Sequence, residues 1–377
     1  MSTDPLHAAP PDAAPGLRVH GGLDLAETDA LGIDPATVLD VSTSVNPCGP
    51  SPAVARAIRT APVHVYPDPA CAAARAALAR ACGTTPERVV LGNGATELLW
   101  TVARVLLAPG DAMVLCEPAF SELGAAAAHA GARVIACRGG EEQGFRSDPA
   151  DAVRMARRHG ARVVALCMPS SPVGEVPAVE SLLALVSRNA DLVFVLDQSF
   201  LALSTHAELR TAAMPDNVIC VRSLTKEHAI PGVRVGYLVA AAERAHAIEI
   251  ARPAWTVGSA AQAAAIASVD ADDFVAATRA RLLSDAGALA DALRGLGYEV
   301  LPSDTTYFVV RVGDAASFRR ALLRGHRVLV RDCTSFGMPA WVRVAARGGE
   351  DARRIVAGFA ELATDFAARG AHVRSRV

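Results

Sequence analysis

Short apolar runs that alternate with longer amphipathic stretches constrain the fold of this 377-residue chain more than any other feature. These runs are largely β-branched, which is typical of buried strands. Strands are predicted at 89–91, 112–116, 133–137, 163–167, 192–196, 218–221 and 233–239, and helices at 70–81, 98–107 and 150–159. Strands that alternate with helices predict a mostly parallel sheet covered by helices on both faces, so the expected class is α/β.

The last third of the chain indicates a smaller α+β domain. A long helical pattern covers 270–296, strands are expected at 299–301, 307–310, 328–331 and 341–345, and helices at 318–323 and 351–366. A further short strand is expected near the start of the chain, at 38–41. The expected organisation is a disordered Ala/Pro-rich arm at 1–19, a segment at 20–50 that joins the small domain, a large domain at 51–262 and a small domain at 263–377.

Composition and charge exclude several classes of partner. The formal net charge is −2 and the arginines are scattered, which gives no support for nucleic-acid binding. No apolar run reaches the roughly 18 residues of a membrane span, and the first residues lack the pattern of a signal peptide. The eight cysteines occur singly, which favours a reducing cytoplasm and argues against a metal site.

One stretch carries the strongest chemical signal. Residues 221–237 read Val-Arg-Ser-Leu-Thr-Lys-Glu-His-Ala-Ile-Pro-Gly-Val-Arg-Val-Gly-Tyr and contain Lys226, the only lysine of the chain. Lys226 is expected on a loop between two core strands. Arginine cannot replace a lysine whose amine must lose its proton and attack a carbonyl, because guanidinium stays protonated. Ser223 and Arg234 flank Lys226 with a hydroxyl and a fixed positive charge, which suits a phosphate.

This stretch resembles the Schiff-base motif of the class I and II aminotransferase superfamily, Ser-x-[Ser/Thr]-Lys-…-Pro-Gly-x-Arg-x-Gly-Tyr. The resemblance implies that Lys226 binds pyridoxal 5′-phosphate. It also implies the fold type I architecture, in which a mostly parallel seven-stranded sheet lies between helices and a smaller domain packs beside it.

The resemblance assigns further residues to the cofactor. The glycine-rich turn at 92–97 opens a helix, and a helix N-terminus attracts anions, so Ala95 and Thr96 are expected to cradle the phosphate. Phe120 takes the place of the aromatic that stacks on the pyridine ring. Asp197, at the end of a predicted central strand, takes the place of the carboxylate that keeps the ring nitrogen protonated.

Two positions depart from the family pattern. The run Met168-Pro-Ser-Ser-Pro-Val-Gly174 has Ser171 where relatives carry an asparagine that donates to the 3′-oxygen of the cofactor. Phe200 stands where many relatives carry a tyrosine with the same role. With both donors changed, we expect the Lys226–cofactor linkage to ionise with a perturbed pKa.

The ends of the chain resemble one branch of the superfamily, that of threonine-phosphate decarboxylase and histidinol-phosphate aminotransferase. The motifs are His20-Gly-Gly, Asp40-x-Ser-x-x-x-Asn-Pro-x-Gly-Pro, Tyr66-Pro-Asp-Pro, and the arginines of 328–333 and 341–347. The resemblance implies a homodimer in which Tyr66 reaches the partner's cofactor phosphate. It assigns Arg343 to a substrate carboxylate, Arg331 to a substrate phosphate, and His20 and Asn46 to substrate binding.

The sequence therefore predicts a pyridoxal-phosphate enzyme that acts on a small phosphorylated amino acid. Decarboxylation of threonine phosphate is the leading hypothesis. Transamination, as in histidinol-phosphate aminotransferase, and altered chemistry in a specialised pathway are the alternatives. A binding protein on an inactive aminotransferase fold is the competing hypothesis from another class, and retention of Lys226, Asp197, Arg234 and Arg343 argues against it.

Overall fold

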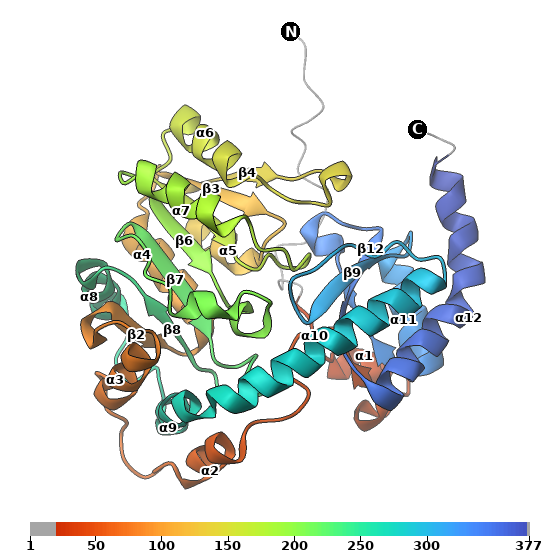
Figure 1. Ribbon diagram of the computed structural model, residues 1–377, viewed down its shortest axis with the longest axis horizontal. Helices are drawn as coiled ribbons and strands as arrows, with labels where there is room; N and C mark the ends of the chain where they lie inside the picture. The colour runs from red at the N-terminus through yellow and green to blue at the C-terminus, as the bar shows by residue number, and fades with distance from the viewer. Residues whose placement is uncertain (1–19, 375–377) are drawn as a thin grey trace.

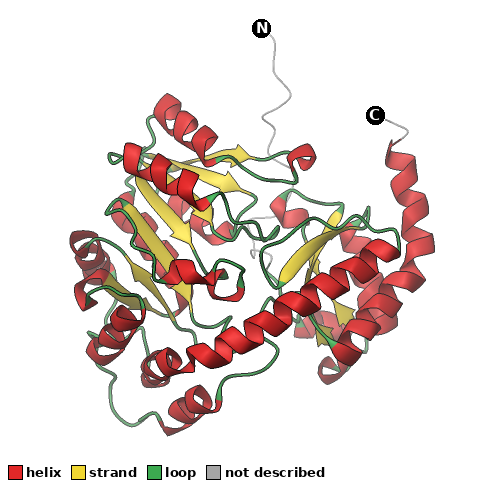
Figure 2. Ribbon diagram, in the orientation of Figure 1, coloured by secondary structure: helices red, strands yellow, loops and turns green. Residues whose placement is uncertain are grey.

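The computed structural model describes residues 20–374, with side chains up to residue 363, so the predicted arm at 1–19 lies outside the described residues. The described chain forms a large sheet flanked by helices and, beside it, two small sheets with helices of their own (Figures 1 and 2). No helix in this part of the chain is long and apolar enough to cross a membrane.

The large sheet has seven strands in the order β2-β8-β7-β6-β5-β3-β4. Its strands are β2 Val89–Gly92, β3 Ala112–Glu117, β4 Arg133–Arg138, β5 Val163–Cys167, β6 Val193–Asp197, β7 Val218–Ser223 and β8 Gly236–Val239. Only β8 among them runs antiparallel to its neighbours. The mostly parallel seven-stranded sheet expected from the sequence is therefore confirmed.

Helices cover both faces of this sheet because its central strands are buried on both sides. One apolar cluster joins the sheet to α4 Gly94–Leu106, α5 Ser121–His129 and α8 Ala242–Ala251. A second cluster joins the other face to α6 Pro149–His159 and α7 Val179–Arg188. Adjacent residues of β6 show the alternation, since Val195 lies in the first cluster and Phe194 in the second. This packing fixes the strand ends from which the site is built.

The smaller part of the fold is built on two short sheets. The antiparallel sheet has the order β11-β12-β9, and β1 pairs in parallel with β10. The strands are β1 Leu39–Asp40, β9 Tyr307–Arg311, β10 Val328–Leu329, β11 Arg331–Asp332 and β12 Trp341–Ala345, and the helices are α10 Asp272–Gly295, α11 Ala315–His326 and α12 Gly349–Arg374. The pairing of β1 with β10 brings the N-terminal segment to this part of the fold, and α10 spans from the large sheet to the small ones (Figure 1).

Two strand predictions in the small part need correction. The strand expected at 299–301 is wrong: the pairing there is one isolated bridge, from Val300 to Val310. The single strand expected at 328–331 is two strands, because β10 pairs with β1 while β11 pairs with β12. The periodicity did not predict helices α5, α7 and α8 of the large sheet, nor α1 Leu25–Ala30, α2 Pro52–Thr60 and α9 Ser259–Ser268. The helix predicted at 70–81 is α3 Ala72–Ala81.

Candidate active site

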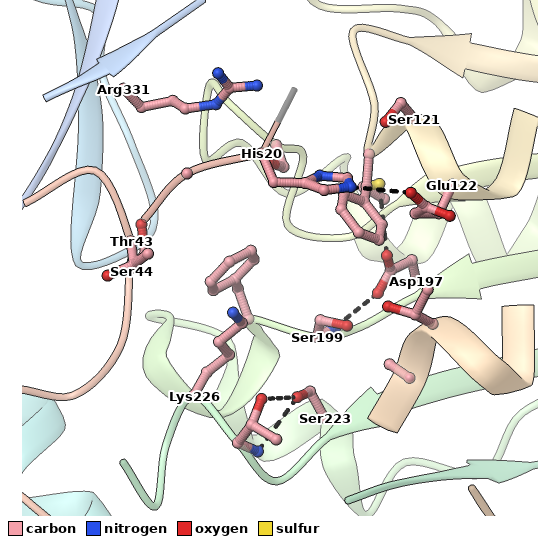
Figure 3. A pocket seen from close by; sticks show the side chains of 18 of the residues that line it. His20, Thr43, Ser44, Ser121, Glu122, Asp197, Ser199, Ser223, Lys226 and Arg331 are labelled. Carbon is pink, nitrogen blue, oxygen red and sulfur yellow. Dashed lines mark hydrogen bonds and ion pairs between the residues drawn. The ribbon is translucent and has the colours of Figure 1, made fainter. Parts of the chain in front are cut away.

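A cavity of about 550 Å³ lies between the large sheet and the small antiparallel sheet. Its walls come from the carboxyl ends of β6 and β7, the N-terminus of α4, and strands β11 and β12 (Figure 3). The sequence-predicted residues that line it are His20, Ala95, Thr96, Phe120, Ser171, Asp197, Phe200, Ser223, Lys226, Arg234, Arg331 and Arg343. The fold thus brings together residues from both ends of the chain.

Lys226 lies in the loop that follows β7, as expected, and its amine points into the cavity (Figure 3). Its Nζ atom is 5.7 Å from the centre of the Phe200 ring. Burial, together with the charges of Arg343 and Arg234, lowers the pKa of Lys226 to about 8, and the charge of Asp197 opposes this shift. A lysine with this pKa has an appreciable neutral fraction near neutral pH, which a nucleophilic amine requires.

Asp197 ends β6, the parallel neighbour of β7, and faces the same cavity. Its side chain is 6 % exposed and accepts a hydrogen bond of 3.0 Å from the backbone N–H of Ser199. Burial raises the pKa of Asp197, while the bonds from Ser199 and the charge of Lys226 oppose that rise. A buried carboxylate directed at a cavity is suited to a cationic partner.

The N-terminus of α4 forms an anion cradle with the loop after β7. Gly94 has φ +81°, a left-handed conformation that favours glycine, and a Cβ atom there would lie 2.5 Å from Nη2 of Arg234, so the guanidinium would have to shift. The hydroxyls of Ser223 and Thr225 lie 2.7 Å apart and line the same side of the cavity. Backbone N–H groups, hydroxyls and a guanidinium together suit a phosphate.

Arg343 projects from β12 into the opposite wall. Its Nη1 donates to Oγ of Ser171 at 3.1 Å and its Nη2 donates to the carbonyl of Ser42 at 2.8 Å. Its guanidinium also lies 5.1 Å from the centre of the Tyr307 ring, and Nε is buried without a hydrogen-bond partner among the described residues. No carboxylate neutralises Arg343 in the hydrogen bonds and ion pairs of residues 20–363, which favours an anionic ligand.

Arg331 lies beside Arg343, because the two are register partners on β11 and β12. Its Nη2 donates to Oγ of Ser335 at 2.8 Å, and its guanidinium lies 5.1 Å from the centre of the Phe336 ring. Burial lowers the pKa of Arg331, and the charge of Arg343 adds to this effect. Two neighbouring buried guanidinium groups repel each other and make this wall of the cavity electropositive.

Glu122 is a cavity residue that the sequence reasoning missed. It accepts hydrogen bonds from Nε1 of Trp100 at 2.8 Å and pairs with Nε2 of His20 at 3.0 Å. The His20 ring in turn lies 5.5 Å from that of Phe120. The only signal in the sequence was that Glu122 stands two positions after Phe120. Its partners, His20 and Trp100, are distant in the sequence, so their contacts with Glu122 could not be predicted.

Asn46 and Tyr66 do not line this cavity. Asn46 is buried and makes hydrogen bonds to the loop of Lys226 and to α10. Tyr66 is 82 % exposed and packs against the ring of Trp255, with 5.1 Å between the ring centres. The described residues contain no group of three or more histidine, cysteine or acidic side chains arranged to hold a metal ion.

Comparison with known proteins places the chain in a family. The model of the class I and II aminotransferases matches residues 36–357, so the chain belongs to this family. It is 32 % identical to histidinol-phosphate aminotransferase 1 of Dechloromonas aromatica, over 83 % of this chain and 87 % of that protein. It is 33 % identical to the histidinol-phosphate aminotransferase of Symbiobacterium thermophilum, over 85 % of this chain and 89 % of that one.

Solved structures show the same fold at lower identity. Histidinol-phosphate aminotransferase from Sinorhizobium meliloti, solved with pyridoxal 5′-phosphate, superposes with a TM-score of 0.83 at 21 % identity, covering 96 % of this chain and 99 % of that one. L-threonine-O-3-phosphate decarboxylase from Porphyromonas gingivalis superposes with a TM-score of 0.73 at 22 % identity, covering 85 % and 98 %.

These comparisons confirm the predicted superfamily, the fold type and the pyridoxal-phosphate-dependent class of enzyme. They do not specifically support the decarboxylase that was the leading hypothesis from the sequence. The alternative, transamination, fits better, because the curated relatives named above are histidinol-phosphate aminotransferases.

Proposed function

We propose that this protein is a pyridoxal-phosphate-dependent aminotransferase, which moves the amino group of a small phosphorylated amine such as histidinol phosphate to a 2-oxo acid. The observation that carries the proposal is the placement of Lys226 and Asp197 after adjacent parallel strands, facing one cavity across from Arg343 and Arg331. An amine, a carboxylate and a cationic wall are the groups that this chemistry needs.

The residues of the cavity fit the cofactor. The α4 N-terminus, Ser223 and Arg234 would hold its phosphate, the ring face of Phe120 would stack on its ring, and Asp197 would pair with the ring nitrogen. The Nε atom of Arg343, buried without a hydrogen-bond partner among the described residues, would be free to bind a further anionic group. When bound, pyridoxal phosphate supplies an electron sink that stabilises negative charge at the substrate carbon next to nitrogen.

The protein's own residues then bind, orient and move a proton. Lys226, whose pKa is about 8, can take a proton at Nζ and return it, which is the work of a general base and acid near neutral pH. Arg343 would bind the carboxylate of the 2-oxo acid with two parallel N–H groups. Arg331 would bind the phosphate of the amine substrate, and His20 lies on the same cavity.

Decarboxylation of threonine phosphate remains the second candidate. The motifs at both ends of the chain favour it. Both reactions use the same lysine, carboxylate and arginines. Which bond breaks depends on which substituent the protein holds perpendicular to the cofactor ring, a matter of orientation.

The two reactions are separated by their products. The holoenzyme is incubated with histidinol phosphate and a 2-oxo acid, and separately with L-threonine phosphate. In the first reaction we expect the 2-oxo acid to be converted into an amino acid, and mass spectrometry monitors this conversion. If threonine phosphate releases carbon dioxide and the first reaction shows no amino transfer, the aminotransferase proposal is wrong and the protein is a threonine-phosphate decarboxylase. A Lys226→Ala chain is the control, and it is expected to do neither.

We also infer that a second copy of the chain covers the surface around Tyr66. Val63 is 90 % exposed, and Val65 and Trp255 are also exposed large apolar side chains in the same region. A cluster of exposed apolar residues is typical of an interface. In the family pattern the tyrosine of this motif serves the partner's site, which agrees with its position outside the cavity of its own chain.

All eight cysteines are unpaired, which favours a reducing compartment such as the cytoplasm.

A further inference from the structure

The carbonyl of Lys226 accepts its shorter hydrogen bond from outside its own loop. This loop joins β7 to β8 and has no strand ladder at Lys226. Within the loop, the Lys226 carbonyl accepts a long hydrogen bond of 3.4 Å from the N–H of Ala229. A side chain that must present its amine at a fixed place therefore depends on contacts with other segments.

Asn46 supplies such contacts through three hydrogen bonds. Its backbone N–H donates to the carbonyl of Lys226 at 2.9 Å. Its carboxamide nitrogen donates to the carbonyl of Glu227 at 2.9 Å and to the hydroxyl of Thr278 at 3.0 Å. Asn46 is 2 % exposed, so water cannot replace these bonds and each is costly to lose.

The same contacts argue against the substrate role that the sequence assigned to Asn46. An asparagine amide has two N–H donors, and both are used within the protein. Its oxygen accepts a bond of 3.0 Å from the backbone N–H of Cys48. Asn46 also does not line the cavity, so a substrate bound there does not reach its side chain.

Asn46 belongs to a segment that connects the two walls of the cavity. At one end of this segment, the carbonyl of Ser42 accepts a hydrogen bond from Arg343. At the other end, Asn46 holds Lys226. Thr278 lies on α10, the helix that spans both parts of the fold (Figure 1). The position of the amine relative to the arginine wall therefore depends on this segment.

We propose that Asn46 is a positioning residue, which holds the peptide of Lys226 so that the amine is enclosed opposite Asp197 and Arg343, and that it does not bind substrate. The inference rests on the proposed function, in which Lys226 carries the cofactor. The charged groups that act on the amine are Arg343 from β12, Arg234 from the loop and Asp197 from β6. If the loop loosens, water reaches the amine and its separation from the two arginines grows, so its pKa rises towards the ordinary value.

The test compares two buried asparagines. Asn46→Leu keeps about the size of the side chain, removes the two hydrogen bonds that the amide donates to Glu227 and Thr278 and the one that its oxygen accepts from Cys48, and leaves only the backbone bond to Lys226. Asn217→Leu is the matched control, because Asn217, just before β7, is also buried and its amide donates to the backbone carbonyls of Val186, Asn189 and Leu192, none of which lines the cavity. The pKa of Lys226 is measured in the full-length, cofactor-free chain by competitive labelling with acetic anhydride across a pH series. The single lysine makes the labelled peptide unambiguous, and melting temperature is recorded in parallel.

We expect Asn46→Leu to raise the pKa of Lys226 by about 0.5 to 1 pH unit, the scale of ordinary changes in environment. Asn217→Leu is expected to lower the melting temperature and leave that pKa unchanged. A folded Asn46→Leu chain with the wild-type pKa would overturn the proposal. If Asn46→Leu does not fold, the pKa of Lys226 is measured in Thr278→Val, which removes the hydrogen bond between Asn46 and Thr278. A smaller rise of this pKa supports the proposal, and an unchanged pKa overturns it.

Borohydride reduction of the wild-type holoenzyme separates this inference from the proposed function. A chain in which Lys226 gains no cofactor mass refutes the proposed function itself. If Lys226 of the wild type gains that mass but the pKa of Lys226 is unchanged in Asn46→Leu, only the role of Asn46 is refuted.

Discussion

Nη1 of Arg343 donates a hydrogen bond to Oγ of Ser171 at 3.1 Å, and both side chains are buried. In the family pattern that residues 168–174 resemble, the position of Ser171 is expected to be an asparagine whose amide donates to the 3′-oxygen of the cofactor. A serine hydroxyl can accept from the guanidinium and still donate its own proton into the cavity. Ser171 therefore anchors Arg343 and keeps one donor where the family has an amide.

Substitutions at Ser171 are expected to change the ionisation of the Lys226–cofactor linkage in opposite directions. A donor to the 3′-oxygen draws electron density from it, so the linked nitrogen holds its proton less tightly. Ser171→Asn should lower the pKa of the linkage and Ser171→Ala should raise it, each by roughly 0.5 to 1 pH unit. The pH dependence of the visible absorbance of the holoenzyme measures both.

Ser170→Ala is the control for these variants, because the hydroxyl of Ser170 accepts from the N–H of Glu175 and does not line the active-site cavity. It should leave the absorbance midpoint unchanged. Equal midpoints in the wild type, Ser171→Asn and Ser171→Ala would show that the serine makes no bond to the cofactor.

The pKa of Lys226 sets how the cofactor-free chain captures pyridoxal phosphate. The amine attacks only when neutral, and its pKa is about 8. The capture rate should rise about tenfold per pH unit below pH 8 and level off above it. Arg343→Gln removes a positive charge that lowers this pKa, so the midpoint should move to higher pH. Stopped-flow absorbance measures the rates.

Arg347→Gln controls for the loss of a half-buried, hydrogen-bonded arginine, since Arg347 donates to the carbonyls of Ala346 and Asp40 and is not among the groups that shift the pKa of Lys226. Its midpoint should match the wild type. A shift of the same size in Arg347→Gln would mean that general loosening, and not the charge of Arg343, moves the pKa.

The large sheet and the placement of Lys226 and Asp197 at one edge of it could be predicted because the signals are local. Each central strand is a short apolar run, and its burial on both faces follows from that composition. Asp197 and Lys226 follow adjacent parallel strands, and the carboxyl ends of such strands meet at one edge of a sheet. Proximity in space then follows from the topology.

The remainder of the site depends on contacts between residues far apart in the chain. Asn46 meets Thr278 across 232 positions and Arg343 meets Ser42 across 301. A single sequence carries no periodicity or local pattern that pairs such residues. For the same reason Glu122 was missed, and the single strand expected at 328–331 did not show its two different partners.

Arg331 is expected to determine the preference for a phosphorylated substrate. A hydrogen bond to a charged group contributes about 1.5–3 kcal/mol, so Arg331→Gln should raise KM for a phosphorylated amine by roughly ten- to a hundredfold. The unphosphorylated amine should be affected much less, because it lacks the partner of the guanidinium. Steady-state kinetics with both amines measure the ratio.

Arg319→Gln is the control for this variant: Arg319 pairs with Glu27 outside the cavity, and the ratio should stay that of the wild type. If Arg331→Gln raises KM equally for both amines, Arg331 contributes to stability or to the shape of the wall that it forms with Phe336, and does not select the phosphate.

Shared active sites predict that two inactive chains restore each other. If Tyr66 serves the partner's site, the chain carrying Lys226→Ala still supplies an intact tyrosine, and the chain carrying Tyr66→Ala still supplies an intact lysine. A mixed dimer then has one complete site, because each site takes its lysine from one chain and its tyrosine from the other. Unfolding and refolding the two variants together should recover activity that neither shows alone, and light scattering should give the mass of a dimer. Each variant refolded with itself is the control. No recovery in a verified mixed dimer would place Tyr66 outside the partner's site, and the exposed apolar surface around Val63 and Trp255 would then need another occupant.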